Sequence, residues 1–207
     1  MLQKDKKMTQ HLHDIDTITN NYALFLKMCS KLGDRSAPVM AMVEHMNERL
    51  LMAPASTKLS YHCAHPRGLV EHSLNVLRNL KKLIKVYEVD VPVESMIIAS
   101  LFHDWGKVGD LEEAYYIEQD SDWHREKLGQ MYKVNEDMQS MPNAERGLWL
   151  LQHFGVQLTL DEWIAIRTND GPGVPENKAY FGREPTLALL LQHADQMATK
   201  QEKERYS

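Results

Sequence analysis

The chain has 207 residues, 43% of them hydrophobic, and its eight prolines and ten glycines are too few for a disordered or many-stranded protein. Its formal charge of −5 argues against a protein that neutralises many phosphates along a nucleic acid, although a small phosphorylated ligand is compatible with it. Two cysteines exclude a disulfide framework, and no stretch is apolar for long enough to span a bilayer or act as a signal peptide, so we expect a soluble, cytoplasmic protein without membrane or stable nucleic-acid partners.

Helical spacing of apolar residues recurs along the chain, and no run alternates as a strand would. Ser36 indicates one helix start, and a capping box of Thr159 and Glu162 indicates another. The patterns predict an all-α fold: one compact helical bundle in which residues 1–50 form helices packed on a core of residues 51–207. Helices are expected over 8–33, 36–52, 68–89, 92–105, 160–171 and 184–204, with long loops at 107–121 and 171–184.

Polar side chains stand where the helical period calls for apolar ones. His72 lies three residues after Leu69 and four before Val76, on or beside the buried face of its helix. Asp195 follows Leu191 by four residues, which places a carboxylate on the inner stripe of the last helix. A buried carboxylate is costly unless it meets a cation, a hydrogen-bond donor or a proton. Both positions therefore need partners inside the bundle.

The stretch LFHDWGKVGD, residues 101–110, ends an apolar helix with His103 and Asp104 side by side. Any one of these polar residues alone would be a hydrogen-bonded core group or half of an ion pair. Together with His72 and Asp195, however, the doublet offers two imidazoles and two carboxylates, which suit manganese, iron, cobalt or zinc, with magnesium as a further candidate. The four residues predict a divalent metal site between the central helices.

Three blocks in this order resemble the HD superfamily of metal-dependent phosphohydrolases. They are HPRGLVEHS with His72, LFHDWGKVGD with His103 and Asp104, and LLLQHADQMA with Asp195. The resemblance covers about residues 55–200. It implies an HD-domain helical bundle, a metal held by these four residues, and hydrolysis of a phosphate ester.

The segments SDWHREKLGQMYKVNEDMQSMP and LTLDEWIAIRTNDG are similar to those of small bacteriophage HD proteins, which include deoxynucleoside triphosphohydrolases acting on dATP. This similarity implies a deoxynucleotide substrate, a homo-oligomer such as a hexamer, and action in the cytoplasm of an infected bacterium. Some HD enzymes hold a second metal, for which His124, His153 and Asp170 are candidates here. Asn169 departs from the His-His-Gly or His-Asp-Gly element of those relatives, which argues against a full two-metal centre.

Cations near these motifs are candidates for phosphate contacts. Lys107 lies one turn beyond the doublet, and Arg67 directly precedes the helix of His72, so both could bind phosphate oxygens. His62 and His65 are candidate phosphate contacts or general acids. With Cys63 they also suggest a second metal site, but one thiol and two imidazoles in four residues cannot close a tetrahedron. Aromatic side chains that could select a base, with ordinary core packing as the alternative, are Trp105, Trp123 and Tyr116.

We therefore expect metal-assisted hydrolysis of a deoxynucleoside triphosphate, with dATP as the first guess, to deoxynucleoside and tripolyphosphate. The metal would lower the pKa of a water molecule or polarise a phosphoryl oxygen, while Lys107, Arg67 and His65 balance the charge of the phosphates. The alternatives are an HD-type 5′-nucleotidase and a phosphodiesterase or exonuclease. The net negative charge of the chain disfavours a nucleic-acid substrate for the second alternative. A catalytically silent scaffold would usually have lost a ligand, and this chain keeps all four.

Overall fold

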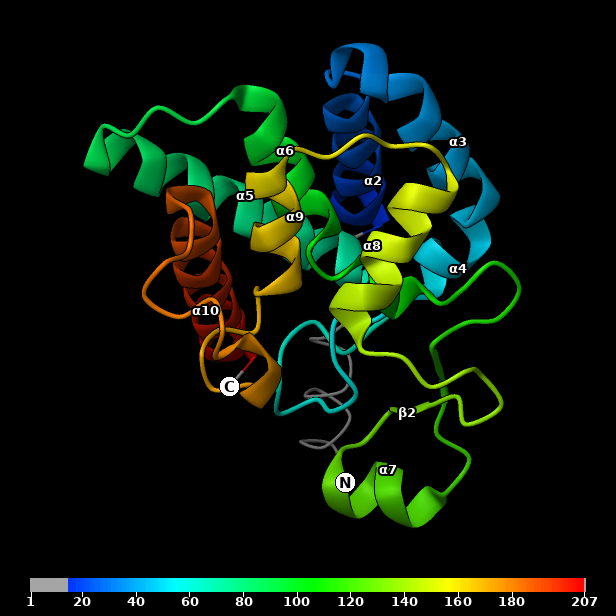
Figure 1. Ribbon diagram of the computed structural model, residues 1–207. Helices are drawn as coiled ribbons and strands as arrows, with labels where there is room; N and C mark the ends of the chain where they lie inside the picture. Colours follow the sequence, from blue (N-terminus) through cyan, green and yellow to red (C-terminus); the bar gives the residue numbers. More distant parts are fainter. Residues whose placement is uncertain (1–14, 207) are drawn as a thin grey trace.

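The computed structural model describes residues 15–206, with side chains for residues 19–205, and it is a helical bundle (Figure 1). The all-α fold predicted from the sequence is confirmed. The predicted helix segment 8–14 lies outside the described residues. The α-helices are α2 Ile15–Cys29, α3 Ser36–His45, α4 Asn47–Met52, α5 Gly68–Tyr87, α6 Val93–Phe102, α7 Asp122–Leu128, α8 Asn143–His153, α9 Leu160–Arg167 and α10 Thr186–Tyr206.

Two expectations about single elements are wrong. Residues 36–52 form two helices, because Met46 leaves the helical conformation, at φ −99° and ψ 9°, and ends α3. The second error concerns strands, none of which was expected. β1 Tyr116–Glu118 and β2 Tyr132–Val134 pair antiparallel around α7, and three residues are too short for alternation to be recognised in a sequence. The hairpin and α7 project from the bundle at the bottom of Figure 1.

The interior contains two clusters of buried apolar side chains. One cluster joins α2, α3 and α4 to α5, α6 and α8. At its centre Phe25 stacks on Trp105 with 6.2 Å between ring centroids, and Phe102 meets Trp105 edge-on at 5.1 Å. Trp105 is therefore a core residue, only 1% exposed, and its candidate role in base selection is wrong.

The second cluster lies between α5, α6, α9 and α10 and includes Val76, Ala165 and Leu191. Since α5 contributes to both clusters, its polar side chains on the buried face are enclosed by the bundle and cannot reach bulk water. This position of α5 determines where the functional site can form. No helix in the described part of the chain is long and apolar enough to cross a membrane.

Candidate metal centre

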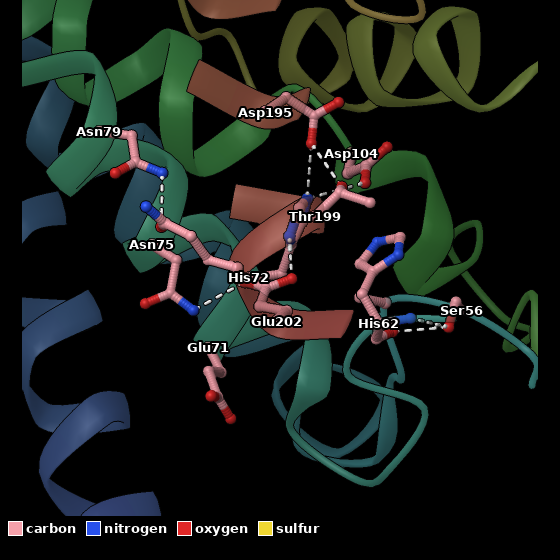
Figure 2. Close-up of polar contacts among 12 residues, drawn as sticks. Ser56, His62, Glu71, His72, Asn75, Asn79, Asp104, Asp195, Thr199 and Glu202 are labelled. Atoms are coloured by element: carbon pink, nitrogen blue, oxygen red, sulfur yellow. Dashed lines mark hydrogen bonds and ion pairs between the residues drawn. The ribbon is translucent and has the colours of Figure 1, made fainter. Parts of the chain in front are cut away.

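Side chains from α5, from the end of α6 and from α10 converge inside the bundle (Figure 2). His72 Nε2 lies 3.0 Å from Asp195 Oδ1 and 3.8 Å from Asp104 Oδ2. His103 Nε2 lies 3.5 Å from Asp104 Oδ2 and 3.9 Å from Asp195 Oδ1. The structure thus brings together the four residues expected as metal ligands, and we refer to them as the four-ligand centre.

The end of α6 explains how two consecutive residues can face one point. His103 keeps helical backbone angles, whereas Asp104 leaves the helix at φ −106° and ψ 13°. In a continuing helix the two side chains would diverge by about 100°. The sequence places this helix end at the site, and the turn that follows it makes the doublet usable as a pair of ligands.

Most of the centre lies inside the bundle. His72, His103 and Asp104 are buried, while the side chain of Asp195 remains 23% exposed. Asp195 is therefore the most accessible of the four side chains.

A hydrogen bond from Nδ1 orients each of the two imidazole rings. His72 Nδ1 donates to Glu202 Oε2, and His103 Nδ1 donates to the carbonyl oxygen of Ser100, both at 2.9 Å. A ring that is protonated on Nδ1 alone carries its lone pair on Nε2. Within the described residues, His103 Nε2 is buried without a hydrogen-bond partner, whereas His72 Nε2 faces Asp195 Oδ1 at 3.0 Å and pairs with that carboxylate when the ring is protonated. Such an arrangement is expensive unless a cation fills the centre, so the donor set fits a metal.

Electrostatics at the centre also call for a positive charge. Burial disfavours the carboxylate of Asp104, but Lys107, His103 and His72 outweigh it and hold its pKa well below the usual range. Burial likewise disfavours the imidazolium of His72, but Asp195 and Glu202 raise its pKa to about 10. Without a metal, the proton of His72 supplies the charge that the carboxylates require. A divalent ion would take over this role.

Lys107 contacts the four-ligand centre directly. Its Nζ donates to Asp104 Oδ2 at 2.6 Å and to the carbonyl oxygen of Ala55 at 3.0 Å. Burial opposes its charge, yet Asp104 raises the pKa of Lys107 above the ordinary value. An ammonium group has three hydrogens, so the geometry leaves one for a further acceptor. Tyr116 lies in the same field, and burial raises its pKa to about 12.

The segment after α9 lies beside the centre. Asn169 Nδ2 donates to the carbonyl oxygen of His103 at 2.7 Å and to that of Ile166 at 2.9 Å, so its role is to hold the end of α9 against the doublet. Desolvation and the charges of Asp104 and Asp195 raise the pKa of Asp170. Asp170 therefore lies within electrostatic reach of the centre without being one of its four converging ligands.

Glu202 was not assigned to the centre from the sequence, whereas His62 was a candidate phosphate contact or general acid. Glu202 is fully buried and accepts from His72 Nδ1 and, at 2.7 Å, from Asn75 Nδ2. His62 has its ring centroid 4.7 Å from that of His72, and Figure 2 shows it beside Asp104. Burial, His72 and Lys107 lower the pKa of His62 to about 4, so it is neutral at pH 7.

Two expected phosphate contacts have their recorded partners elsewhere. Arg67 caps α5 in the left-handed conformation, at φ 63°, and lines a hollow with Glu48 and Met52. His65 contacts its neighbour's carbonyl oxygen, and its Nε2 lies 3.6 Å from Glu71 Oε2. Neither has a recorded contact with the four-ligand centre.

The histidines considered for a second metal are also engaged in other contacts. His124 binds the Ser121 hydroxyl through Nδ1 at 2.8 Å, at the start of α7. His153 lies among the aromatic rings of Trp149 and Phe154, at the end of α8.

Comparison of the chain with family models, with curated proteins and with solved structures finds no match.

Proposed function

We propose that this protein is a metal-dependent phosphohydrolase of the HD type, which hydrolyses a deoxynucleoside triphosphate to deoxynucleoside and tripolyphosphate. The observation that carries the proposal is the convergence of His72, His103, Asp104 and Asp195, with both imidazoles turned so that Nε2 faces the centre. The choice of a triphosphate, and of dATP as the leading substrate, rests on the motif resemblance. So do the homo-oligomeric state and the setting in a phage-infected bacterium.

The four residues would hold the metal through two nitrogens and two carboxylate oxygens. This donor set suits manganese, iron, cobalt or zinc better than magnesium, which prefers oxygen ligands. When bound, such an ion supplies Lewis acidity, polarising phosphoryl oxygens and lowering the pKa of water. The phosphates would approach it beside Asp195, the most exposed of the four side chains.

The protein's own groups then bind and orient the substrate. Lys107 is fixed by Asp104 and Ala55 and can donate its remaining hydrogen to a phosphate oxygen. Asp170 would accept a hydrogen bond from water near the centre; desolvation and the charges of Asp104 and Asp195 raise its pKa. His62, which Figure 2 shows near Asp104, adds a neutral imidazole.

The test is a product assay. Metal-free protein is reloaded with manganese, cobalt or magnesium and incubated with deoxynucleoside and ribonucleoside mono-, di- and triphosphates, and the products are separated by chromatography. We expect equal amounts of deoxynucleoside and tripolyphosphate, and no turnover by Asp195→Ala. Glu204→Gln, which changes an exposed acid on the same helix, serves as the control.

Other products identify the alternatives. Orthophosphate released only from monophosphates would make the protein a 5′-nucleotidase. Cleavage of oligonucleotides or cyclic dinucleotides, with triphosphates untouched, would make it a phosphodiesterase or exonuclease. Absence of turnover with every substrate, while metal binds to the four-ligand centre, would overturn the enzyme proposal and favour a scaffold.

A further inference from the structure

A second group of metal-ligand side chains lies outside the four-ligand centre, at the loop that leads into α5. Its members are Cys63 and His65 from the loop and Glu71 from the first turns of the helix. One ligand atom from each lies within 4.8 Å of the other two. We propose that Cys63, His65 and Glu71 bind a zinc ion, and we call this group the loop site.

The backbone of the loop holds Cys63 firmly in place. Cys63 has φ 44°, a left-handed conformation that non-glycine residues rarely adopt, and its carbonyl oxygen accepts from the amide of Ala55 at 3.0 Å. Gly68 packs against the same carbonyl, so closely that a Cβ there would lie 2.0 Å from the oxygen. This close approach brings the Cys63 and His65 side chains to the first turns of α5, where Glu71 stands.

The distances are close to those of a tetrahedral zinc site. Bonds of about 2.0–2.3 Å to nitrogen, oxygen and sulfur place the ligand atoms of a tetrahedron about 3.4–3.8 Å apart. Small side-chain movements are therefore sufficient to close the three ligands around an ion. A water molecule or other small ligand would complete the coordination, as in zinc sites with three protein ligands.

The charges of the group also favour a dication. One carboxylate oxygen of Glu71, Oε1, is 3.0 Å from Arg205 Nη1, while Oε2 faces His65. Arg205 thus orients the carboxylate from the exposed end of α10 and leaves Oε2 for the ion. Burial, with Glu202 and Glu71, raises the pKa of the Cys63 thiol well above its usual range, so zinc binding would release the thiol proton to the solvent.

Zinc, rather than magnesium or calcium, follows from the ligand types. A thiolate and an imidazole are borderline-soft donors that bind zinc well and bind hard cations poorly. The buried carboxylates of Glu202 and Glu71 make an isolated Cys63 thiolate unfavourable. They do not disfavour a thiolate whose charge a metal neutralises. The loop site shares no ligand with the four-ligand centre, although the Cys63 thiol and His72 both hydrogen-bond Glu202, which lies between the two sites.

Cobalt provides the test, because only a thiolate ligand gives an intense charge-transfer band in the near ultraviolet. Reduced, chelator-treated protein is titrated with two equivalents of Co²⁺ and then with Zn²⁺. We expect the band to appear with cobalt and to vanish on addition of zinc. Cys63→Ala should abolish it, whereas Cys29→Ala, which changes the core cysteine, should retain it.

Two further variants separate the sites and guard against misfolding. His65→Ala and Glu71→Gln keep the thiol and should weaken cobalt binding at the loop site by roughly 10-fold or more. Asp195→Ala should keep the band while the stoichiometry falls from two to one, so a failure at the four-ligand centre is distinguishable. A wild-type titration without the band, a band that persists in Cys63→Ala, or unchanged cobalt affinity in both His65→Ala and Glu71→Gln would overturn the proposal.

Discussion

Glu202→Gln tests how far metal binding at the four-ligand centre depends on Glu202, which accepts a hydrogen bond from His72 Nδ1. The two carboxylate oxygens accept from different donors, His72 Nδ1 at 2.9 Å and Asn75 Nδ2 at 2.7 Å. A glutamine has nearly the same shape but only one acceptor, so its NH₂ group must face one of these donors. If it faces His72, the imidazole hydrogen moves to Nε2 and blocks the atom that would bind metal.

The structure sets the size of the effect. Removing the partner that orients a metal-binding histidine typically weakens metal affinity roughly 10- to 100-fold, which corresponds to about 1.4–2.7 kcal/mol. If the amide turns the other way, Asn75 loses its acceptor, and the free energy of unfolding falls by about 1.5–3 kcal/mol, the contribution of a hydrogen bond to a charged group. Either orientation therefore has a measurable cost.

Manganese dissociation constants, measured by calorimetry or by competition with a chromophoric chelator, provide the assay. Urea unfolding of the metal-free protein measures the second cost. Glu204→Gln is the matched control, because it makes the same substitution on the same helix at a position 65% exposed. If Glu202→Gln binds manganese within twofold of the wild type and unfolds at the same urea concentration, Glu202 does not orient His72 and the reasoning is refuted.

Five further predictions concern the same centre and its scaffold. Asp195 and Glu202 outweigh burial and raise the pKa of His72 to about 10, so a metal must displace the proton of His72 at neutral pH. The apparent metal affinity should therefore rise about tenfold per pH unit between about pH 7 and 9. Calorimetry in buffers of different ionisation enthalpy should count about one proton released per metal bound. For the metal-free protein, the stabilisation from this raised pKa is complete below the ordinary value of 6.5 and is lost as the pH rises through about 10, so the urea midpoint should fall over that range. Lys107→Ala should retain metal, measured by elemental analysis, but raise KM for the phosphorylated substrate; loss of metal would show that Lys107 acts mainly by supporting Asp104. Asp104→Ala should abolish turnover and lower metal stoichiometry while circular dichroism shows unchanged helicity, and full activity in this variant would contradict the ligand assignment. Thr159→Ala removes the capping box of α9 and should lower the free energy of unfolding by about 1 kcal/mol without changing kcat, whereas a large loss of activity would link α9 to the site.

Helical periodicity was sufficient to predict where the four ligands would meet. His72 and Asp195 interrupt apolar stripes, and a stripe that faces the core must bring its polar members there too. The capping box at Thr159 was equally predictable, because it depends on two side chains three residues apart. Such patterns are predictable because they depend only on residues a few positions apart in the sequence.

Other features depend on backbone geometry that no local pattern specifies. Arg67 adopts a left-handed conformation at the start of α5, which no local pattern predicted. Glu202 was overlooked because it lies in the charged stretch QEKE, which resembles a solvated helix end. Its position seven residues after Asp195, two turns along one face, was the signal that could have identified it.

The order in which the ligands leave the ribosome has a consequence for how the protein acquires metal. His72, His103 and Asp104 are synthesised well before α10, which carries both Asp195 and the Glu202 that orients His72. Asp195 follows Asp104 by 91 residues, so at about 5–20 residues per second the first three ligands wait on the order of 5–20 s for the fourth. Until α10 docks against α5, a nascent chain has neither the second carboxylate nor the fixed imidazole tautomer. If the centre holds the proposed metal, complete loading would therefore follow the synthesis and docking of α10.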